Sequence, residues 1–237
     1  MDILLISLGP VAIIAAFIWT RDKYEREPLG RLMLALLAGI LIILPAAGAE
    51  SLLSAAGESL EGIYETAWRA FAVAGLTEEV LKYLALFLLI WKSPEFNDKY
   101  DGIVYATFIS LGFAGLENLL YVLQEGYATG IVRAFTAVPA HAIFGIIMGF
   151  YFGLAKFYPR KRQSMKLKAL FFPVLLHGIY DFILMTGIDW LWFAFLGFLV
   201  LLYYTGIRYM RNLADQSFFK TDYDLLNEKF SKNDSNP

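Results

Sequence analysis

The stretch VRAFTAVPAHAIFGIIMGFYFGL, residues 132–154, decides the class of fold. From Ala134 onward it holds a single residue that ordinarily titrates near neutral pH, His141. An apolar run of about 20 residues is long enough to cross the core of a bilayer as a helix. Further apolar runs of similar length precede and follow this one along the chain. The sequence therefore predicts an all-α membrane protein.

The predicted bundle has about seven spanning helices, at residues 3–20, 32–48, 67–91, 102–123, 132–154, 169–186 and 190–206. They form one polytopic membrane domain over residues 1–206, followed by a cytoplasmic tail at 207–237. The segment 49–65 contains four glutamates and two glycines, so we expect an extramembrane loop or surface helix there. The first helix lacks the basic start and the cleavage site of a signal peptide, which predicts that it is retained.

The composition supports a membrane protein and removes several kinds of chemistry. Hydrophobic residues make up 58% of the chain, which exceeds the share in ordinary soluble domains. There is no cysteine, so disulfides, a thiol nucleophile and thiolate zinc sites are excluded. The formal net charge of −2 gives no indication of nucleic-acid binding, and we expect none.

The positive charges predict the orientation in the membrane. With seven helices, the loops at 21–31, 92–99 and 155–168 and the tail carry four, two, six and five Lys or Arg residues. The opposite side carries only Arg69 and Arg133. Because cytoplasmic loops are enriched in Lys and Arg, we expect the N-terminus outside and the C-terminus in the cytoplasm. The basic loop at 155–168 also suits contact with anionic lipids.

Several ionisable residues lie inside the predicted spans, where each costs about 2.5–3.5 kcal/mol on insertion scales. They should therefore face the interior of the bundle and meet one another. Spacings of three or four residues place partners on one helical face. With a rise of about 1.5 Å per residue, the predicted topology puts these groups at one level, roughly 8–17 Å below the outer edge. The set comprises Glu78, Glu79, Lys82, Glu117, His141, His177 and Asp181.

This set suits general acid–base hydrolysis, because burial makes a carboxylate a better base and a histidine N–H can stabilise an oxyanion. Glu78 is a candidate base for activating water, although the spacing leaves open whether Glu78 or Glu79 is the partner of Lys82. A structural ion pair at Glu79 and Lys82 and a packing hydrogen bond at His177 are the alternatives without catalysis. The glycines at steps of four after His141 indicate close helix packing.

Four short motifs on successive predicted helices together resemble the PrsW family of glutamic-type intramembrane proteases. They are Glu78-Glu79-x-x-Lys82, Phe113-x-x-x-Glu117-Asn118, His141-x-x-x-Gly145 and His177-x-x-x-Asp181. The segment Asp22-Lys23-Tyr24-Glu25-Arg26-Glu27-Pro28 is also similar to that family. The order is kept from about residue 20 to 185, which makes the combination far more specific than any one motif. The patterns H-E-x-x-H, G-x-S-G and G-x-G-D of other intramembrane proteases do not occur.

The resemblance implies a multi-pass endopeptidase of the bacterial plasma membrane, with a catalytic four-helix core at about 67–186. Its implied substrate is a single-pass membrane protein such as an anti-sigma factor, cut at site 1 near the outer face during envelope stress. The catalytic candidates are Glu78, Glu79, Glu117, His141, His177 and Asp181, with Lys82, Asn118 and Phe113 in support.

The distantly related CAAX prenyl endopeptidases carry F-x-x-x-H and H-x-x-x-N in addition to a double glutamate. Here Glu117 stands in place of the first histidine and Asp181 in place of the asparagine. We hypothesise that His141 supplies the missing imidazole.

The sequence favours a mechanism without a metal or another cofactor, and it leaves zinc at Glu78, Glu117, His141 and His177 as the alternative. Two other functions compete with the protease. A proton- or ion-coupled transporter also uses Glu and His relays inside the membrane, although no inverted repeat is evident. The second competing function is that of a membrane scaffold without enzymatic activity.

Overall fold

The computed structural model describes residues 2–22 and 24–221, and within them the regular secondary structure is entirely helical. The elements are α1 (Asp2–Arg21), α2 (Leu29–Leu41), α3 (Ile43–Ala56), α4 (Ile63–Ala67), the π-helix η1 (Trp68–Leu76), α5 (Thr77–Ile90), α6 (Lys99–Glu125), α7 (Tyr127–Phe135), α8 (Ala137–Phe157), the 3₁₀ turn η2 (Pro159–Lys161), α9 (Arg162–Met185) and α10 (Leu191–Asp215). The prediction of an all-α fold is confirmed.

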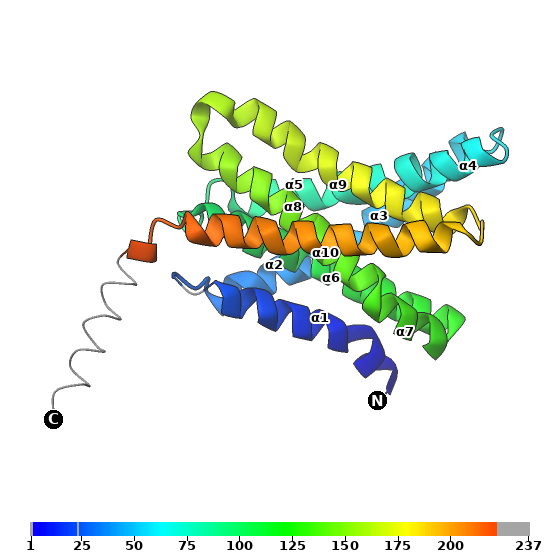
Figure 1. Cartoon of the computed structure of the whole chain (residues 1–237), viewed down its shortest axis with the longest axis horizontal. Coiled ribbons are helices and arrows are strands. Elements are labelled where there is room, and N and C mark those ends of the chain that lie inside the picture. The colour runs from blue at the N-terminus through cyan, green and yellow to red at the C-terminus, as the bar shows by residue number, and fades with distance from the viewer. Residues whose placement is uncertain (1, 23, 222–237) are drawn as a thin grey trace.

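These elements join into seven long helical stretches in the described part of the chain, as Figure 1 shows. Six of them are long and apolar enough to cross a membrane: 3–21, 29–56, 99–125, 127–157, 159–185 and 191–215. The seventh runs from Ile63 to Ile90 through α4, η1 and α5, and it carries Glu78, Glu79 and Lys82 at its centre. The polytopic bundle predicted from hydropathy is therefore confirmed.

Three boundaries differ clearly from the sequence-based expectation, and one of them is the start of α9, which begins at Arg162 instead of near residue 169. The second stretch does not end near residue 48 but runs to Ala56, so the connection is confined to residues 57–62. The flank 49–56 is rich in Ala, Leu and Ser, and one glutamate does not interrupt a helix. The last helix likewise continues beyond residue 206 to Asp215. The density of charged residues in the sequence predicts where an apolar run ends, but the helix itself can continue beyond that residue.

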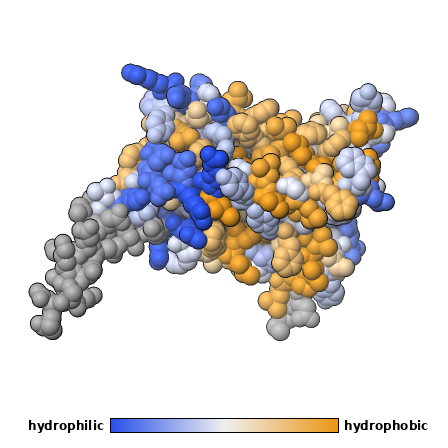
Figure 2. Space-filling model, in the orientation of Figure 1, coloured by the Kyte–Doolittle hydropathy of each residue, from blue (hydrophilic) through white to orange (hydrophobic). Residues whose placement is uncertain are grey.

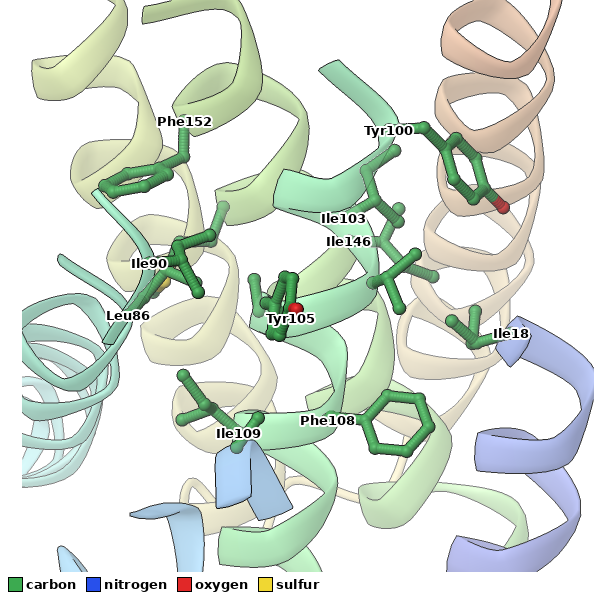
Figure 3. Close-up of a cluster of buried hydrophobic side chains, with 14 of the residues drawn as sticks. Ile18, Leu86, Ile90, Tyr100, Ile103, Tyr105, Phe108, Ile109, Ile146 and Phe152 are labelled. Carbon is green, nitrogen blue, oxygen red and sulfur yellow. The ribbon is translucent and has the colours of Figure 1, made fainter. Parts of the chain in front are cut away.

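Helix α6 forms the centre of the bundle. Within its most apolar stretch 78% of the residues are buried, against 17% for α1. Figure 3 shows the apolar cluster around it, in which Ile103, Tyr105 and Ile109 of α6 lie among side chains of neighbouring helices. Figure 1 shows α10 passing in front of α8 and α6. Figure 2 shows the outward apolar surface on this face, with hydrophilic residues gathered towards the ends of the bundle.

The glycines of α8 allow close contact with α6, as their spacing predicted. A Cβ on Gly149 would lie 2.1 Å from the carbonyl oxygen of Gly102, and one on Gly153 would lie 2.2 Å from that of Lys99. Real Cβ atoms do not approach so closely, so the two backbones touch only because these side chains are absent. This contact fixes the position of His141, which lies one turn before the glycine stripe begins.

The connection between α1 and α2 folds back onto α6. The backbone N–H of Glu27 donates to the Asp22 carboxylate at 3.1 Å, and the Tyr105 hydroxyl of α6 donates to the Glu27 carboxylate. Both carboxyl groups are buried, at 5% exposure each. Burial is the main cause that raises the pKa of Asp22 and of Glu27, each to about 7.

Residues Trp68–Leu76 form a π-helix of nine residues directly before the double glutamate. Such helices are rare, and short π segments occur frequently at functional sites. Here the wider turn packs against α9, where a Cβ on Gly178 would collide with the Phe71 ring at 2.1 Å. The π-helix therefore sets the position of Glu78 and Glu79 relative to α9.

Candidate active site

A cavity of about 220 Å³ lies inside the bundle, between the long helices that carry the sequence motifs. It is lined by Glu50, Ser54, Arg69, Val73, Ala74, Glu78, Glu117, Tyr121, Arg133, Ala137, Ala140, His141, Phe144, His177, Tyr180, Asp181 and Met185. Five of the six catalytic candidates from the sequence are thus found at one cavity. The sixth, Glu79, lies directly behind the wall and is fully buried.

Lys82 is at the centre of the polar network and is only 1% exposed. Its ammonium group donates to Glu78 Oε2 at 3.0 Å and to Glu79 Oε1 at 2.8 Å, and its Nζ lies 3.1 Å from His141 Nδ1. An ammonium group has three donors and no acceptor, so these three contacts use all of them. Lys82 therefore pairs with both glutamates, whereas the sequence spacing had left the choice between them open.

The network assigns the tautomer of His141. Because Lys82 donates to Nδ1, that nitrogen carries no proton, and the proton of a neutral ring lies on Nε2. Nε2 then donates to Glu117 Oε2 at 3.0 Å. Glu117 in turn accepts a hydrogen bond from Arg133 Nη2 at 2.7 Å. His141 is therefore held between a buried ammonium and a carboxylate that Arg133 fixes.

His177 of α9 bridges two carboxylates. Its Nδ1 lies 3.0 Å from Glu79 Oε1, and its Nε2 lies 3.3 Å from Asp181 Oδ2. The ring stacks on Phe144 at a centroid distance of 5.1 Å and meets the His141 ring edge to face, also at 5.1 Å. The two imidazoles thus lie next to each other although 36 positions separate them in the sequence.

The supporting residues predicted from the motifs surround this network. The Lys82 ammonium lies 4.3 Å above the Phe113 ring, and that ring contacts His141 at a centroid distance of 5.9 Å. Asn118 accepts from Arg133 Nε at 3.2 Å and donates to the Ser7 carbonyl of α1 at 3.2 Å. Asn118 therefore connects the site to the first helix.

Three charged residues at the cavity were not among the candidates from the sequence: Glu50, Arg69 and Arg133. Arg133 was expected only as an outer-side charge, like Arg69, yet it anchors Glu117 and stacks on Tyr121 at 3.8 Å. Glu50 was assigned to a solvated segment, yet it lines the cavity from α3 and is partly buried. The helical pattern continuing past residue 48 was the indication that could have placed Glu50 inside.

The site also has the composition of a metal site. Glu78, Glu79, His141 and His177 each offer a ligand atom within 4.8 Å of the others. Two carboxylates and two imidazoles are a suitable donor set for zinc. Glu79 Oε2 is buried without a hydrogen-bond partner in the described part of the chain, so it is an available ligand atom. These residues fit a metal ion.

The geometry adds two conditions to that fit. The convergent group contains Glu79 where the sequence-based zinc set had Glu117, because Glu117 faces the far nitrogen of His141. Lys82 contacts three of the four donors, so its ammonium and a metal ion would compete for them.

The fold and the cavity together define a multi-pass membrane protein with an acid–base hydrolytic site inside its bundle. The family described as PrsW family intramembrane metalloprotease matches residues 27–207, and the chain belongs to that family. The chain is 39% identical to Protease PrsW of Geobacillus kaustophilus over 86% of this chain and 89% of that protein. It is 36% identical to Protease PrsW of Clostridioides difficile, over 92% and 93% of the two chains.

Protease PrsW of Bacillus subtilis is 34% identical over 85% of this chain and 91% of its own length. No solved structure shows a significant match. The comparisons confirm the predicted peptidase of a bacterial membrane and give no support to the transporter. The description as a metalloprotease agrees with the zinc alternative from the sequence, whereas the metal-free glutamate mechanism stays a prediction.

Proposed function

We propose that the chain hydrolyses a peptide bond of a single-pass membrane protein, with Glu78 as the general base at the cavity. The observation that carries this proposal is the convergence of Glu78, His177 and the His141–Glu117 pair on one cavity inside the bundle. Glu78 lines this cavity and is 5% exposed, whereas Glu79 is 0% exposed and is enclosed by Lys82 and His177. Glu78 therefore meets water and substrate, and Glu79 orients the lysine and the imidazole.

The chemistry follows from these positions. Glu78 removes a proton from a water molecule while the water oxygen bonds to the carbonyl carbon. The Nδ1 of His177 is held by Glu79, and its Nε2–H, which has the longer contact of 3.3 Å with Asp181, is shared with the oxygen that becomes negative. The C–N bond then breaks, and the proton held by Glu78 passes to the departing amine. The products are one new carboxyl end and one new amino end.

A zinc ion held by Glu78, Glu79, His141 and His177 would supply Lewis-acid polarisation and a more acidic water. The charges around the cavity favour an additional cation. Glu78, Glu79, Glu117 and Asp181 outnumber Lys82 and Arg133, the cationic side chains that contact this carboxylate group. Protonation of His177 would offset part of this excess negative charge, and so would a bound metal ion.

The position of the cavity supports a cut near the outer face. Figure 1 places the basic α8–α9 connection and the end of α10 at one end of the bundle, and α4, α7 and the α9–α10 turn at the other. Among the lining residues, Arg69 lies just after α4 and Met185 ends α9 before the α9–α10 turn, so the cavity lies towards this second end. If the basic end faces the cytoplasm, the cavity lies in the outer half of the membrane. This arrangement suits site-1 cleavage of an anti-sigma factor in envelope-stress signalling.

The test is co-expression of a single-pass anti-sigma factor with wild type and with Glu78→Gln, His141→Ala and His177→Ala at matched membrane abundance. Wild type should give a product cut near the outer face, and the three variants should leave the substrate intact. The matched control is Glu61→Gln, which makes the same chemical change at an exposed position next to α4. Equal cleavage by Glu78→Gln and wild type would reject Glu78 as the base.

A further inference from the structure

A groove between α1 and α10 lies apart from the candidate active site and shares no lining residue with it. Both helices pack on α6 and α8, and the groove runs between them. It has two sections, of about 430 and 320 Å³, which meet at Phe17, Ile207 and Met210. Together they form one continuous hollow along the C-terminal halves of the two helices.

The section nearer the middle of the membrane is apolar. Its walls are side chains of α1, α8 and α10, among them Ile13 and Phe17, Ile143 and Ile146, and Ile207 and Met210. These residues offer no charged group to an occupant. Such a channel suits a hydrocarbon chain, which makes no hydrogen bonds.

The second section is polar and lies where both helices end. Arg21 and Arg211 line it, and neither guanidinium makes an ion pair with another described residue. The single lining carboxylate in the described chain, Asp215, contacts Lys220 at 3.2 Å. Tyr100 also lines the section and is 4% exposed, and its buried hydroxyl has no hydrogen-bond partner among the described residues.

We propose that this groove binds one anionic phospholipid, with an acyl chain in the apolar section and the phosphate between Arg21 and Arg211. Guanidinium groups bind phosphate oxygens by paired hydrogen bonds, and the Tyr100 hydroxyl supplies one further donor. The site lies at the basic end of the bundle, and the cytoplasmic leaflet is the one with negative surface potential.

The length of the groove decides between a lipid and other occupants. A free phosphate would use the arginines and leave the apolar section without a role. A substrate helix would have no path from this groove to Glu78, because the two lining sets are separate. A phospholipid fits both sections at once, and its headgroup lies at the depth where both spanning helices end.

The test compares lipid retention by the full chain in detergent micelles doped with phosphatidylglycerol or with phosphatidylcholine, measured by native mass spectrometry. Wild type should retain one phosphatidylglycerol with about tenfold preference, because the quaternary ammonium of phosphatidylcholine would place a positive charge next to Arg21 and Arg211, and tenfold corresponds to about 1.4 kcal/mol. Arg211→Glu should remove that preference. Arg208→Glu is the matched control, since it makes the same change three residues away on α10 and does not line the groove.

Two further variants keep the proposal testable if the charge reversal disturbs folding. Tyr100→Phe removes only the hydroxyl and should weaken retention of the lipid. Ile207→Trp narrows the junction of the two sections and should lower retention of the lipid, whereas Val200→Trp, on an exposed position of the same helix, should not. Equal loss in Arg208→Glu and Arg211→Glu, equal retention of both lipids, or displacement by millimolar inorganic phosphate alone would overturn the proposal.

Discussion

Replacing Lys82 by methionine removes the ammonium group that three buried side chains share. The methionine keeps a flexible apolar stem against Phe113, so the change acts mainly on charge. Glu78 and Glu79 then lose the cation at 3.0 and 2.8 Å, in surroundings that are at most 5% exposed. Breaking a buried ion pair by removing one partner costs about 3–5 kcal/mol. The folded state of Lys82→Met should therefore be strongly destabilised.

That loss corresponds to a melting temperature lowered by roughly 6–20 °C for a chain of this size. The measurement is thermal unfolding of purified protein in one detergent at one pH, with cleavage assayed on the same preparations. Cleavage should also be lost, because Lys82 orients both Glu78 and His141. Lys92→Met is the control, since Lys92 is exposed just beyond the end of α5.

A second substitution separates charge balance from simple loss of packing. Glu79→Gln in the Lys82→Met background removes one of the two uncompensated carboxylates, so the double variant should be more stable than Lys82→Met alone. It should remain inactive. A melting temperature of Lys82→Met within about 1 °C of wild type would refute the reasoning, since a buried pair of this kind cannot be lost at no cost.

Three further predictions follow from the fold and the site. Gly149→Ala should prevent accumulation of folded protein, because the new Cβ would lie 2.1 Å from the Gly102 carbonyl oxygen. A Cβ at Gly197 meets open space, so Gly197→Ala should accumulate normally. Equal membrane abundance of the two variants would contradict the packing argument. Burial raises the pKa of Asp22 and Glu27 to about 7 in the folded state, so their contribution to stability is present below about pH 4 and is lost as the pH rises to about 7. The melting temperature should therefore fall less steeply over this pH range in Glu27→Gln than in wild type. An identical slope in the two proteins would count against a raised pKa of Glu27. Exhaustive chelation distinguishes the two mechanisms: cleavage that persists at a metal content near zero is the result expected with Glu78 as the base, whereas a loss of cleavage that added zinc restores would assign the Glu/His group to a metal ion.

Much of the site could be predicted from the sequence because the membrane makes charge expensive. Glu78, Glu79 and Lys82 stand three or four residues apart inside an apolar helix, so they had to face inward and meet. The same cost applies to Glu117, His141 and His177 on three other helices. The prediction that these groups meet follows from that cost, and the structure brings them together at one cavity.

The pairing inside the network could not be predicted in this way. Helical spacing places Lys82 near both glutamates, but it does not say that the third donor reaches His141, 59 positions away. Nor does it reveal that Glu117 faces the far nitrogen of that ring and is held by Arg133. Such contacts depend on how the helices rotate against one another, and the packing of the whole bundle sets that rotation.

Glu50 shows a different limit. Several glutamates follow it in the sequence, and this density of charge predicted a position outside the membrane. In the structure it faces the cavity because α3 continues for two more turns. The function of such a residue depends on which helix face it occupies, and a count of nearby charges does not contain that information.

The π-helix Trp68–Leu76 has a consequence for how this family tolerates changes in length. A π-helix holds more residues per turn than an α-helix, so deleting one residue from this stretch allows it to relax to α geometry. The relaxed turn would absorb the missing residue, because an α turn holds about one residue fewer than a π turn, so Glu78 and Glu79 would keep their face of the helix. Homologous chains that lack one residue in this stretch should therefore have an α turn in its place and still present the double glutamate to the cavity. The spacing from the turn at Gly62 to the double glutamate would thus be able to differ by one residue without loss of the site.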